Sequence, residues 1–185
     1  MIELATPSLD GLSQFADALR RGWSPDSVRG RVAAEEALAA IEADAAGFVA
    51  RLTDPEAKGS PVTLPDGSKV ARLPGRHFWI WDGEFCGALG IRWQNGSAAL
   101  PAHVLGHVGY SVVPWKQGRG CATAALRAVL PYARALGLPY VEITTDPDNL
   151  ASQKVITANG GVLIESFAKP AAFGNAPGLR YRIPL

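Results

Sequence analysis

The chain has 185 residues, 48% of them hydrophobic, which is enough to bury one sizeable core. Its formal net charge is +1, and its basic residues are too sparse for the patches that bind nucleic acid. No segment approaches the roughly 20 apolar residues of a membrane span, and the acidic N-terminus does not resemble a secretion signal. Cys86 and Cys121 form neither a disulfide framework nor a zinc site on their own, so we expect no metal and a reducing, cytoplasmic location.

The first sixty residues predict two helices. Apolar residues recur at helical spacing over residues 8–21, where Ser8 suits the N-cap. An alanine-rich segment over residues 28–52 predicts a second helix, with a break at Gly47.

After Val70 the pattern changes from helices to strands. Runs of aromatic and β-branched residues over 77–81, 85–92 and 105–113 predict an antiparallel meander. Pro131 lies inside the helix predicted over residues 122–136 and should kink or shorten it. The later elements are a helix over 122–136, a strand over 140–145, a helix over 150–158 and strands over 162–167 and 179–183.

The segment from Gly109 to Thr123 carries the clearest chemical signal, because it reads as a strand, a glycine-bearing turn and the start of a helix. Glycines let the backbone approach an anion closely, and the first amides of a helix point outward at its positive end. No acidic residue lies between Glu84 and Glu142, whereas five basic residues do. We therefore predict a phosphate-bearing ligand at this turn; a purely structural turn is the alternative. The five basic residues are Arg92, Lys116, Arg119, Arg127 and Arg134.

Two common phosphate motifs do not account for this turn. The P-loop consensus is absent. The dinucleotide fingerprint would need Gly or Ala where Thr123 stands, and it belongs on the first strand of a parallel sheet rather than after a meander.

Read as Gln-x-x-Gly-x-Ala over residues 117–122, the turn resembles the acetyl-coenzyme A pyrophosphate motif of the GNAT N-acetyltransferases. Downstream, Asn149-Leu-Ala-Ser152 followed by a glycine turn at residues 159–161 is similar to the second signature of that family. The resemblance is closest to the family's bacterial branch of predicted acetyltransferases. It implies an α+β fold in which a mixed, twisted sheet is flanked by helices on both faces.

The resemblance also implies how the chain is organised. We expect one domain over residues 1–185, with an N-terminal helical part over 1–60 and a sheet and acetyl-CoA-binding part over 70–185. A homodimer is compatible with this organisation, and neither nucleic acid nor a membrane is an expected partner.

Acetyl-CoA is the co-substrate that the resemblance implies. The strand before the turn would lend main-chain groups to the pantetheine arm, the turn would hold the pyrophosphate, and two polar residues would bind the arm from the other side. The cofactor-binding residues so implied are Ser111, Val112, Val113, Gln117, Gly118, Arg119, Gly120, Cys121, Ala122, Thr123, Asn149 and Ser152.

The implied reaction is direct attack of a small-molecule amine on the thioester in a ternary complex, with a main-chain amide near Val112 polarising the carbonyl. His107 is the predicted base, because it stands two residues before Gly109, where many family members carry a glutamate. A structural role for this histidine stays open, and His103, Glu142 and bulk water are the other candidates for the base.

Two further residues, Ile156 and Cys121, bear on the catalytic mechanism. Ile156 stands where many relatives have a tyrosine that acts as general acid, so no acid is assigned. Covalent catalysis through Cys121 is disfavoured, since no histidine and acid are fixed beside it in the sequence. The alternatives to a small-molecule acetyltransferase are a non-catalytic acyl-CoA sensor and an enzyme acting on a protein or aminoacyl-tRNA amine.

Overall fold

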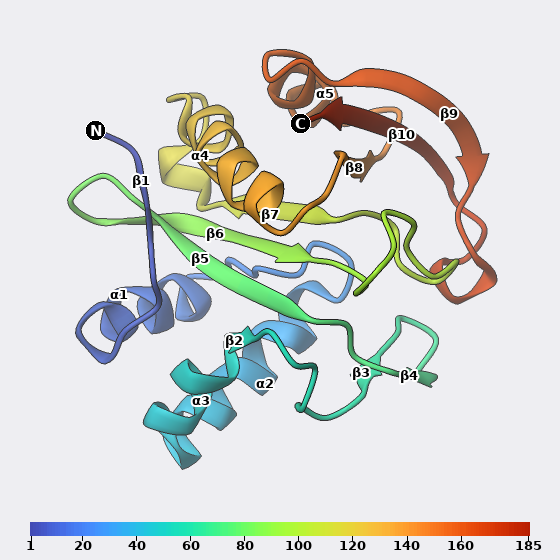
Figure 1. Cartoon of the computed structure of the whole chain (residues 1–185). Coiled ribbons are helices and arrows are strands. Elements are labelled where there is room, and N and C mark those ends of the chain that lie inside the picture. The colour runs from blue at the N-terminus through green and yellow to red at the C-terminus, as the bar shows by residue number, and fades with distance from the viewer.

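A five-stranded antiparallel sheet lies at the centre of the computed structural model, which describes residues 1–185 (Figure 1). Its strand order is β1-β5-β6-β7, and β2 pairs with β5. The Asp82-Gly83 turn joins β5 to β6, which form the first antiparallel pair of the predicted meander. The strands of this sheet are β1 (Glu3–Ala5), β2 (Thr53–Asp54), β5 (Gly75–Trp81), β6 (Phe85–Arg92) and β7 (Val108–Val112).

A second, three-stranded sheet has the order β8-β10-β9 and is also antiparallel. A small hairpin, β3 and β4, stands apart from both sheets. The strands of the second sheet and the hairpin are β8 (Tyr140–Thr145), β9 (Val162–Ala168), β10 (Pro177–Pro184), β3 (Val62–Thr63) and β4 (Lys69–Val70).

Helices cover both faces of the five-stranded sheet (Figure 1). α1, α2 and α3 lie on one face, and α4, with α5 beside it, lies on the other. None of these helices is both long and apolar enough to span a membrane. Their bounds are α1 (Leu9–Arg20), α2 (Gly30–Ala43), α3 (Ala45–Arg51), α4 (Cys121–Ala135) and α5 (Leu150–Thr157), and two 3-10 turns are η1 (Pro114–Lys116) and η2 (Ala171–Phe173).

Each face of the sheet buries its own apolar cluster. On the α1 face the ring of Phe15 stacks on that of Trp79 with 5.4 Å between centroids, and Trp79 is only 2% exposed. On the α4 face, Leu126 of α4 packs in the same cluster as Leu89 and Ile91 of β6. The alternation of buried side chains along β5 and β6 therefore directs consecutive residues to opposite cores.

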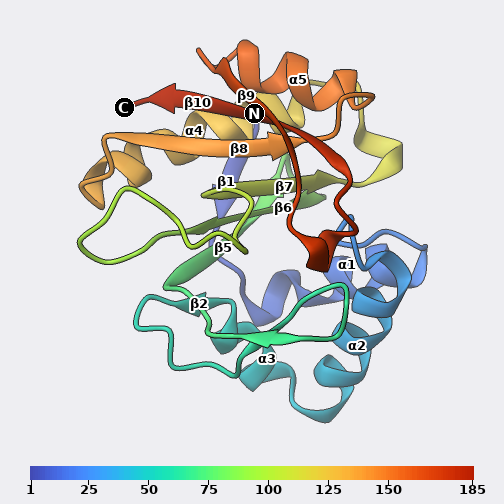
Figure 2. The same ribbon diagram turned by 90° about the vertical axis from the view of Figure 1, so that its right-hand side faces the viewer.

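β7 and β8 lie side by side and run in the same direction (Figure 2). The connection between them passes through α4, as a parallel arrangement requires. The expected α+β fold with helices on both faces is confirmed, and its mixed character arises where two antiparallel sheets meet at the parallel strands β7 and β8. The two strands form no ladder; their one main-chain hydrogen bond joins His107 N–H to the Glu142 oxygen at 2.7 Å.

The structure differs from three sequence expectations. The long second helix breaks at Asp44 rather than at Gly47, because the Asp44 carboxylate accepts from Gly47 N–H at 2.8 Å and caps α3. β7 begins at Val108 rather than at residue 105, since the N–H of the preceding histidine turns to Glu142. Pro131 does not shorten α4, because it stands on an exposed side of the helix and removes a single N–H donor.

The stacked pair on the α1 face generates a stability prediction. Trp79→Ala should lower the free energy of unfolding by roughly 3–5 kcal/mol, because it empties a buried aromatic position. Leu9→Ala on the exposed side of α1, where the side chain is 55% exposed, should change it by less than about 0.5 kcal/mol. Urea denaturation of the two variants measures both values, and a loss below 1 kcal/mol for the tryptophan variant, on the order of a surface substitution, would contradict this core assignment.

Candidate functional site

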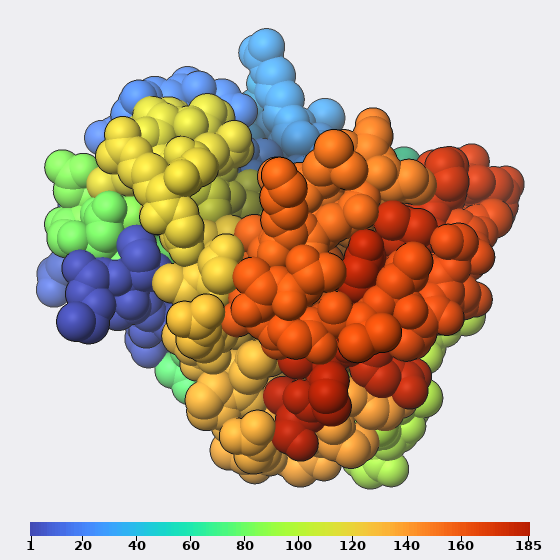
Figure 3. Space-filling view, turned by 90° about the horizontal axis from the view of Figure 1, so that it is seen from above, coloured from blue at the N-terminus to red at the C-terminus, as the bar shows by residue number.

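The glycine turn before α4 presents a row of free main-chain donors. Every N–H from Gly118 to Thr123 lacks a hydrogen-bond partner within the chain. Gly118 and Gly120 have φ of 74° and 78°, and an added Cβ at either would meet no atom within 4 Å. Figure 3 shows this yellow segment on the surface beside the orange segment that contains α5. Such a row, at the positive end of a helix, suits an anion with several oxygens.

The two basic side chains nearest the turn have different surroundings. Arg119 is exposed and forms no ion pair. Lys116 is buried, and its Nζ lies 2.9 Å from Asp82 Oδ1 and 2.9 Å from Glu84 Oε2. These hydrogen bonds raise the pKa of Lys116 above its ordinary value. Of these two residues, only Arg119 therefore adds a free positive charge at the turn.

The edge of β7 that faces β8 also offers unpaired main-chain groups. Main-chain groups of His107 and Val113 hydrogen-bond to β6. Because such positions alternate along a strand, Gly109 and Ser111, which lie between them, also direct their main-chain groups toward β6. The intervening Tyr110 and Val112 must direct N–H and C=O away from β6. No ladder to β8 satisfies these groups, and Gln117 Nε2 donates to the Val112 oxygen at 3.1 Å. The Val112 N–H remains open.

The predicted ligand-binding side chains of α5 already have partners. Asn149 Oδ1 accepts from Ser152 N–H at 3.0 Å and caps the helix, which leaves the Asn149 amide nitrogen free. Ser152 Oγ lies 2.9 Å from the hydroxyl of Tyr110. Burial raises the pKa of Tyr110 to about 12. These contacts bring α5 and β7 together across the gap between β7 and β8.

Ser111 and Cys121 direct their side chains away from that gap. The Ser111 hydroxyl donates to Ser24 O at 3.0 Å and accepts from Trp23 Nε1 at 2.9 Å, so only its main chain lies along β7. The thiol of Cys121 is buried and points at the Lys116 carbonyl oxygen, 3.6 Å away. This burial also disfavours covalent catalysis through Cys121.

His107 occupies the junction of β7 and β8 in one defined tautomer. The residue is fully buried, and its Nδ1 accepts from Glu142 N–H at 3.0 Å, which places the proton on Nε2. Burial lowers the pKa of His107, with the Glu142 carboxylate opposing the effect. No lone pair is left for a substrate proton, so the geometry argues against the predicted role as base. Glu142 is itself paired with Arg182 at 2.6 Å, and Nε2 of His103 is buried without a partner.

Two side chains that the sequence did not single out as site residues lie on the α1 face of the sheet. His77 is exposed although β5 is an inner strand, and its Nδ1 lies 3.2 Å from the Leu52 oxygen. Arg92 on β6 has no ion-pair partner. Neither residue belongs to a local motif; what singles them out is their position in the register, which sequence spacing alone does not reveal.

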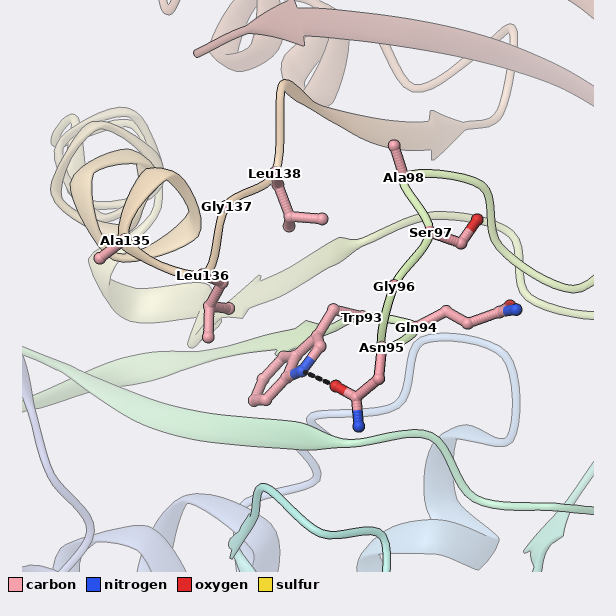
Figure 4. Close-up of a pocket in the computed structure, with 10 residues that line it drawn as sticks. All are labelled: Trp93, Gln94, Asn95, Gly96, Ser97, Ala98, Ala135, Leu136, Gly137 and Leu138. Atoms are coloured by element: carbon pink, nitrogen blue, oxygen red, sulfur yellow. Dashed lines mark hydrogen bonds between the residues drawn. The ribbon is translucent and has the colours of Figure 1, made fainter.

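Two surface hollows lie away from the glycine turn. One, of about 540 Å³, lies at the far end of α4 and is lined by residues 93–98 and 135–138 (Figure 4). Trp93 Nε1 donates to Asn95 Oδ1 there at 3.1 Å, and no titratable side chain lines it. The other, of about 430 Å³, follows β8 and is lined by Asp146, Pro147, Asp148, Lys169, Ala176 and Pro177. The first hollow offers no group for proton transfer, so we do not assign the chemistry to it.

The chain is similar in fold to solved acetyltransferase structures. A ribosomal protein L7/L12 alpha-N-acetyltransferase in complex with coenzyme A is 15% identical, with a TM-score of 0.62 over 100% of this chain and 94% of that one. A microcin C7 self-immunity acetyltransferase in complex with acetyl-CoA and AMP is 11% identical, with a TM-score of 0.61 over 100% and 92%. A candidate ribosomal-protein-serine acetyltransferase of Vibrio cholerae is 15% identical, with a TM-score of 0.61 over 100% and 94%.

The sequence itself matches a family model. No curated protein matches the chain. The model described as the acetyltransferase (GNAT) domain matches residues 36–162, which include the glycine turn, α4 and α5. The chain therefore belongs to the GNAT family, whose acetyltransferases use acetyl-CoA as co-substrate.

Proposed function

We propose that this chain transfers the acetyl group of acetyl-CoA to the amine of a small molecule, by direct attack in a ternary complex. The observation that carries this proposal is the row of unpartnered N–H groups over residues 118–123 beside the open edge of β7. Together they provide an anion site and a place where an extended ligand arm can complete the strand edge.

The roles follow from the position of each donor. The main-chain donors of residues 118–123 bind the pyrophosphate, and Arg119 adds one free positive charge. The open groups of Tyr110 and Val112 bind the pantetheine arm, while α5 closes the other side through Asn149. The Val112 N–H is the donor for the thioester carbonyl, whose oxygen gains negative charge as the amine attacks.

The proton of the attacking amine goes to water in this proposal, since His107 has no free lone pair. The thiolate leaves unassisted, because a thiol of pKa near 8.5 is a tolerable leaving group and buried Ile156 cannot donate a proton. Proximity then supplies much of the rate. We also infer a cytoplasmic location, because both cysteines are free thiols.

A panel of small amines tests the activity. With acetyl-CoA and purified protein, at least one amine should release free coenzyme A thiol. At subsaturating acceptor, the rate should rise with pH, and the midpoint of the rise should move with the pKa of the amine, because no histidine accepts its proton. A midpoint fixed across acceptors would reveal a base on the enzyme, and coenzyme A binding without turnover on any amine would favour the sensor.

Gly120→Asp should abolish coenzyme A binding in calorimetry. The new carboxylate would repel the diphosphate at the start of α4. The matched control is Gly137→Asp, since Gly137 has φ of 81°, open space around its Cβ position and a place at the other end of the same helix. Both variants should lose roughly 1–2 kcal/mol of stability from backbone strain, but only the first should lose the ligand. Equal affinities in the two variants would rule out the turn as the site.

Two replacements at His107 separate a structural role from a base. His107→Ala leaves the Glu142 N–H without its acceptor and should cost about 1–3 kcal/mol in urea denaturation. His107→Asn should lose less, because the asparagine Oδ1 can accept the same hydrogen bond, and it should keep most of the turnover. Loss of turnover in both variants with stability and coenzyme A affinity intact would reinstate the histidine as base.

A further inference from the structure

One row of cross-strand partners on the α1 face of the sheet is nearly free of side chains. His77 of β5 stands opposite Gly90 of β6, and Gly90 stands opposite Gly109 of β7. Gly90 is buried and Gly109 is half-buried, and because neither has a side chain, the His77 ring and the Arg92 guanidinium lie close over this strip of backbone next to the open edge of β7. Gly109 lies three residues before Val112 on the same strand, roughly 10 Å along β7 from the place proposed for the thioester.

The guanidinium of Arg92 lies over this strip without a partner. Its Nη2 is 3.4 Å from the position that a Cβ on Gly109 would take. The side chain donates no hydrogen bond and has no carboxylate within 4.0 Å, although burial lowers its pKa. By contrast, Arg180 and Arg182 are both paired with Glu142. Arg92 is half-buried, and a partly desolvated guanidinium without a counter-ion is stabilised when an anion binds beside it.

The carboxylate that opposes this pKa shift is Asp26, and it is engaged elsewhere. Asp26 Oδ1 accepts from the N–H groups of Val28 and Arg29, at 2.9 Å each, and it forms no ion pair with Arg92. The nearby Arg72 is paired with Asp54 at 3.8 Å. The strip thus holds one unpaired positive charge.

His77 supplies an acceptor at the other end of the strip. Because the Leu52 oxygen can only accept, Nδ1 carries the proton and Nε2 keeps its lone pair. Nε2 lies 3.2 Å from the Cβ position of Gly90. Desolvation and the charge of Arg92 lower the pKa of His77 to about 4, yet the residue is exposed. This exposed imidazole is therefore neutral at pH 7.

We propose that the acceptor of this enzyme is a small amine that also carries a carboxylate, and that Arg92 binds this carboxylate over the Gly90–Gly109 strip while His77 Nε2 accepts a hydrogen bond from the same molecule. This inference rests on the proposed acetyl transfer and names its substrate class. A planar guanidinium binds a carboxylate through two parallel hydrogen bonds. One cation beside a neutral imidazole fits a single negative charge better than the double charge of a phosphate.

Matched acceptors test the proposal: glycine, β-alanine and L-serine, each beside its carboxamide. The wild-type enzyme should prefer the carboxylate of at least one pair by about ten- to a hundredfold in kcat/KM, the usual range for hydrogen bonds to a charged group. Arg92→Gln should remove this preference, mainly through KM, and Arg92→Lys should restore part of it. Coenzyme A affinity should not change in either variant.

Two further variants complete the test. Arg134→Gln removes an exposed, unpaired arginine from the last turn of α4 and should leave both the preference and the rate unchanged. Gly90→Ala adds a methyl group 3.0 Å from His77 Cδ2 and should raise the KM of the acceptor without changing coenzyme A affinity.

The possible failures are distinguishable. If carboxamides react as well as carboxylates, and Arg92→Gln changes neither, the inference is overturned while acetyl transfer stands. If no amine is acetylated, the proposed function fails. In that case, calorimetry that titrates the same amino acids into the protein–coenzyme A complex tests whether Arg92 binds the carboxylate. Binding that is lost in Arg92→Gln supports the carboxylate site. Absent binding, or binding that the variant leaves intact, overturns it.

Discussion

The central constraint in this molecule is that β7 and β8 lie side by side without forming a ladder. A strand edge inside a fold normally satisfies its N–H and C=O groups by pairing, since each unpaired buried group costs free energy. Here one main-chain hydrogen bond at His107 joins the strands, and the outward groups of Tyr110 and the N–H of Val112 are left without a strand partner. The fold therefore carries an incomplete sheet next to its core, and an extended ligand can complete it.

At the start of α4, main-chain N–H groups rather than side chains form the proposed anion site. Left-handed φ angles at Gly118 and Gly120 turn the chain into the helix while keeping the approach clear. A site built from main-chain groups depends on the positions of the glycines and of the end of the strand. This is consistent with a shared fold among structures that are only 11–15% identical to this chain.

The sequence predicts the features that depend on local pattern. The strand–turn–helix segment, the order of elements after Val70 and the N-cap at Ser8, which accepts from Gly11 N–H, all follow from spacing and turn chemistry. The break in the N-terminal helices was misplaced, because an aspartate that caps the next helix decides it and the pattern showed only the glycine that donates to it.

Features that depend on register do not follow from the sequence. Which nitrogen of His107 carries the proton depends on the N–H of Glu142, 35 residues away. The alignment of His77 with Gly90 and Gly109 depends on two hairpin registers, and local composition gives no sign of it. Residue types could thus be read from the sequence, whereas their protonation and partners required the fold.

Lys116 affects the electrostatic potential at the proposed anion site through its ion pairs rather than through contact with the anion. Its ammonium group holds Asp82 and Glu84, the last acidic residues before a long stretch without any, and its carbonyl lies against Cys121 in the first turn of α4. Without this lysine, two carboxylates would project their field toward the row of N–H donors. The lysine pairs with both carboxylates and neutralises that field, so the attraction proposed for the turn would depend on a residue that does not contact the polyanion.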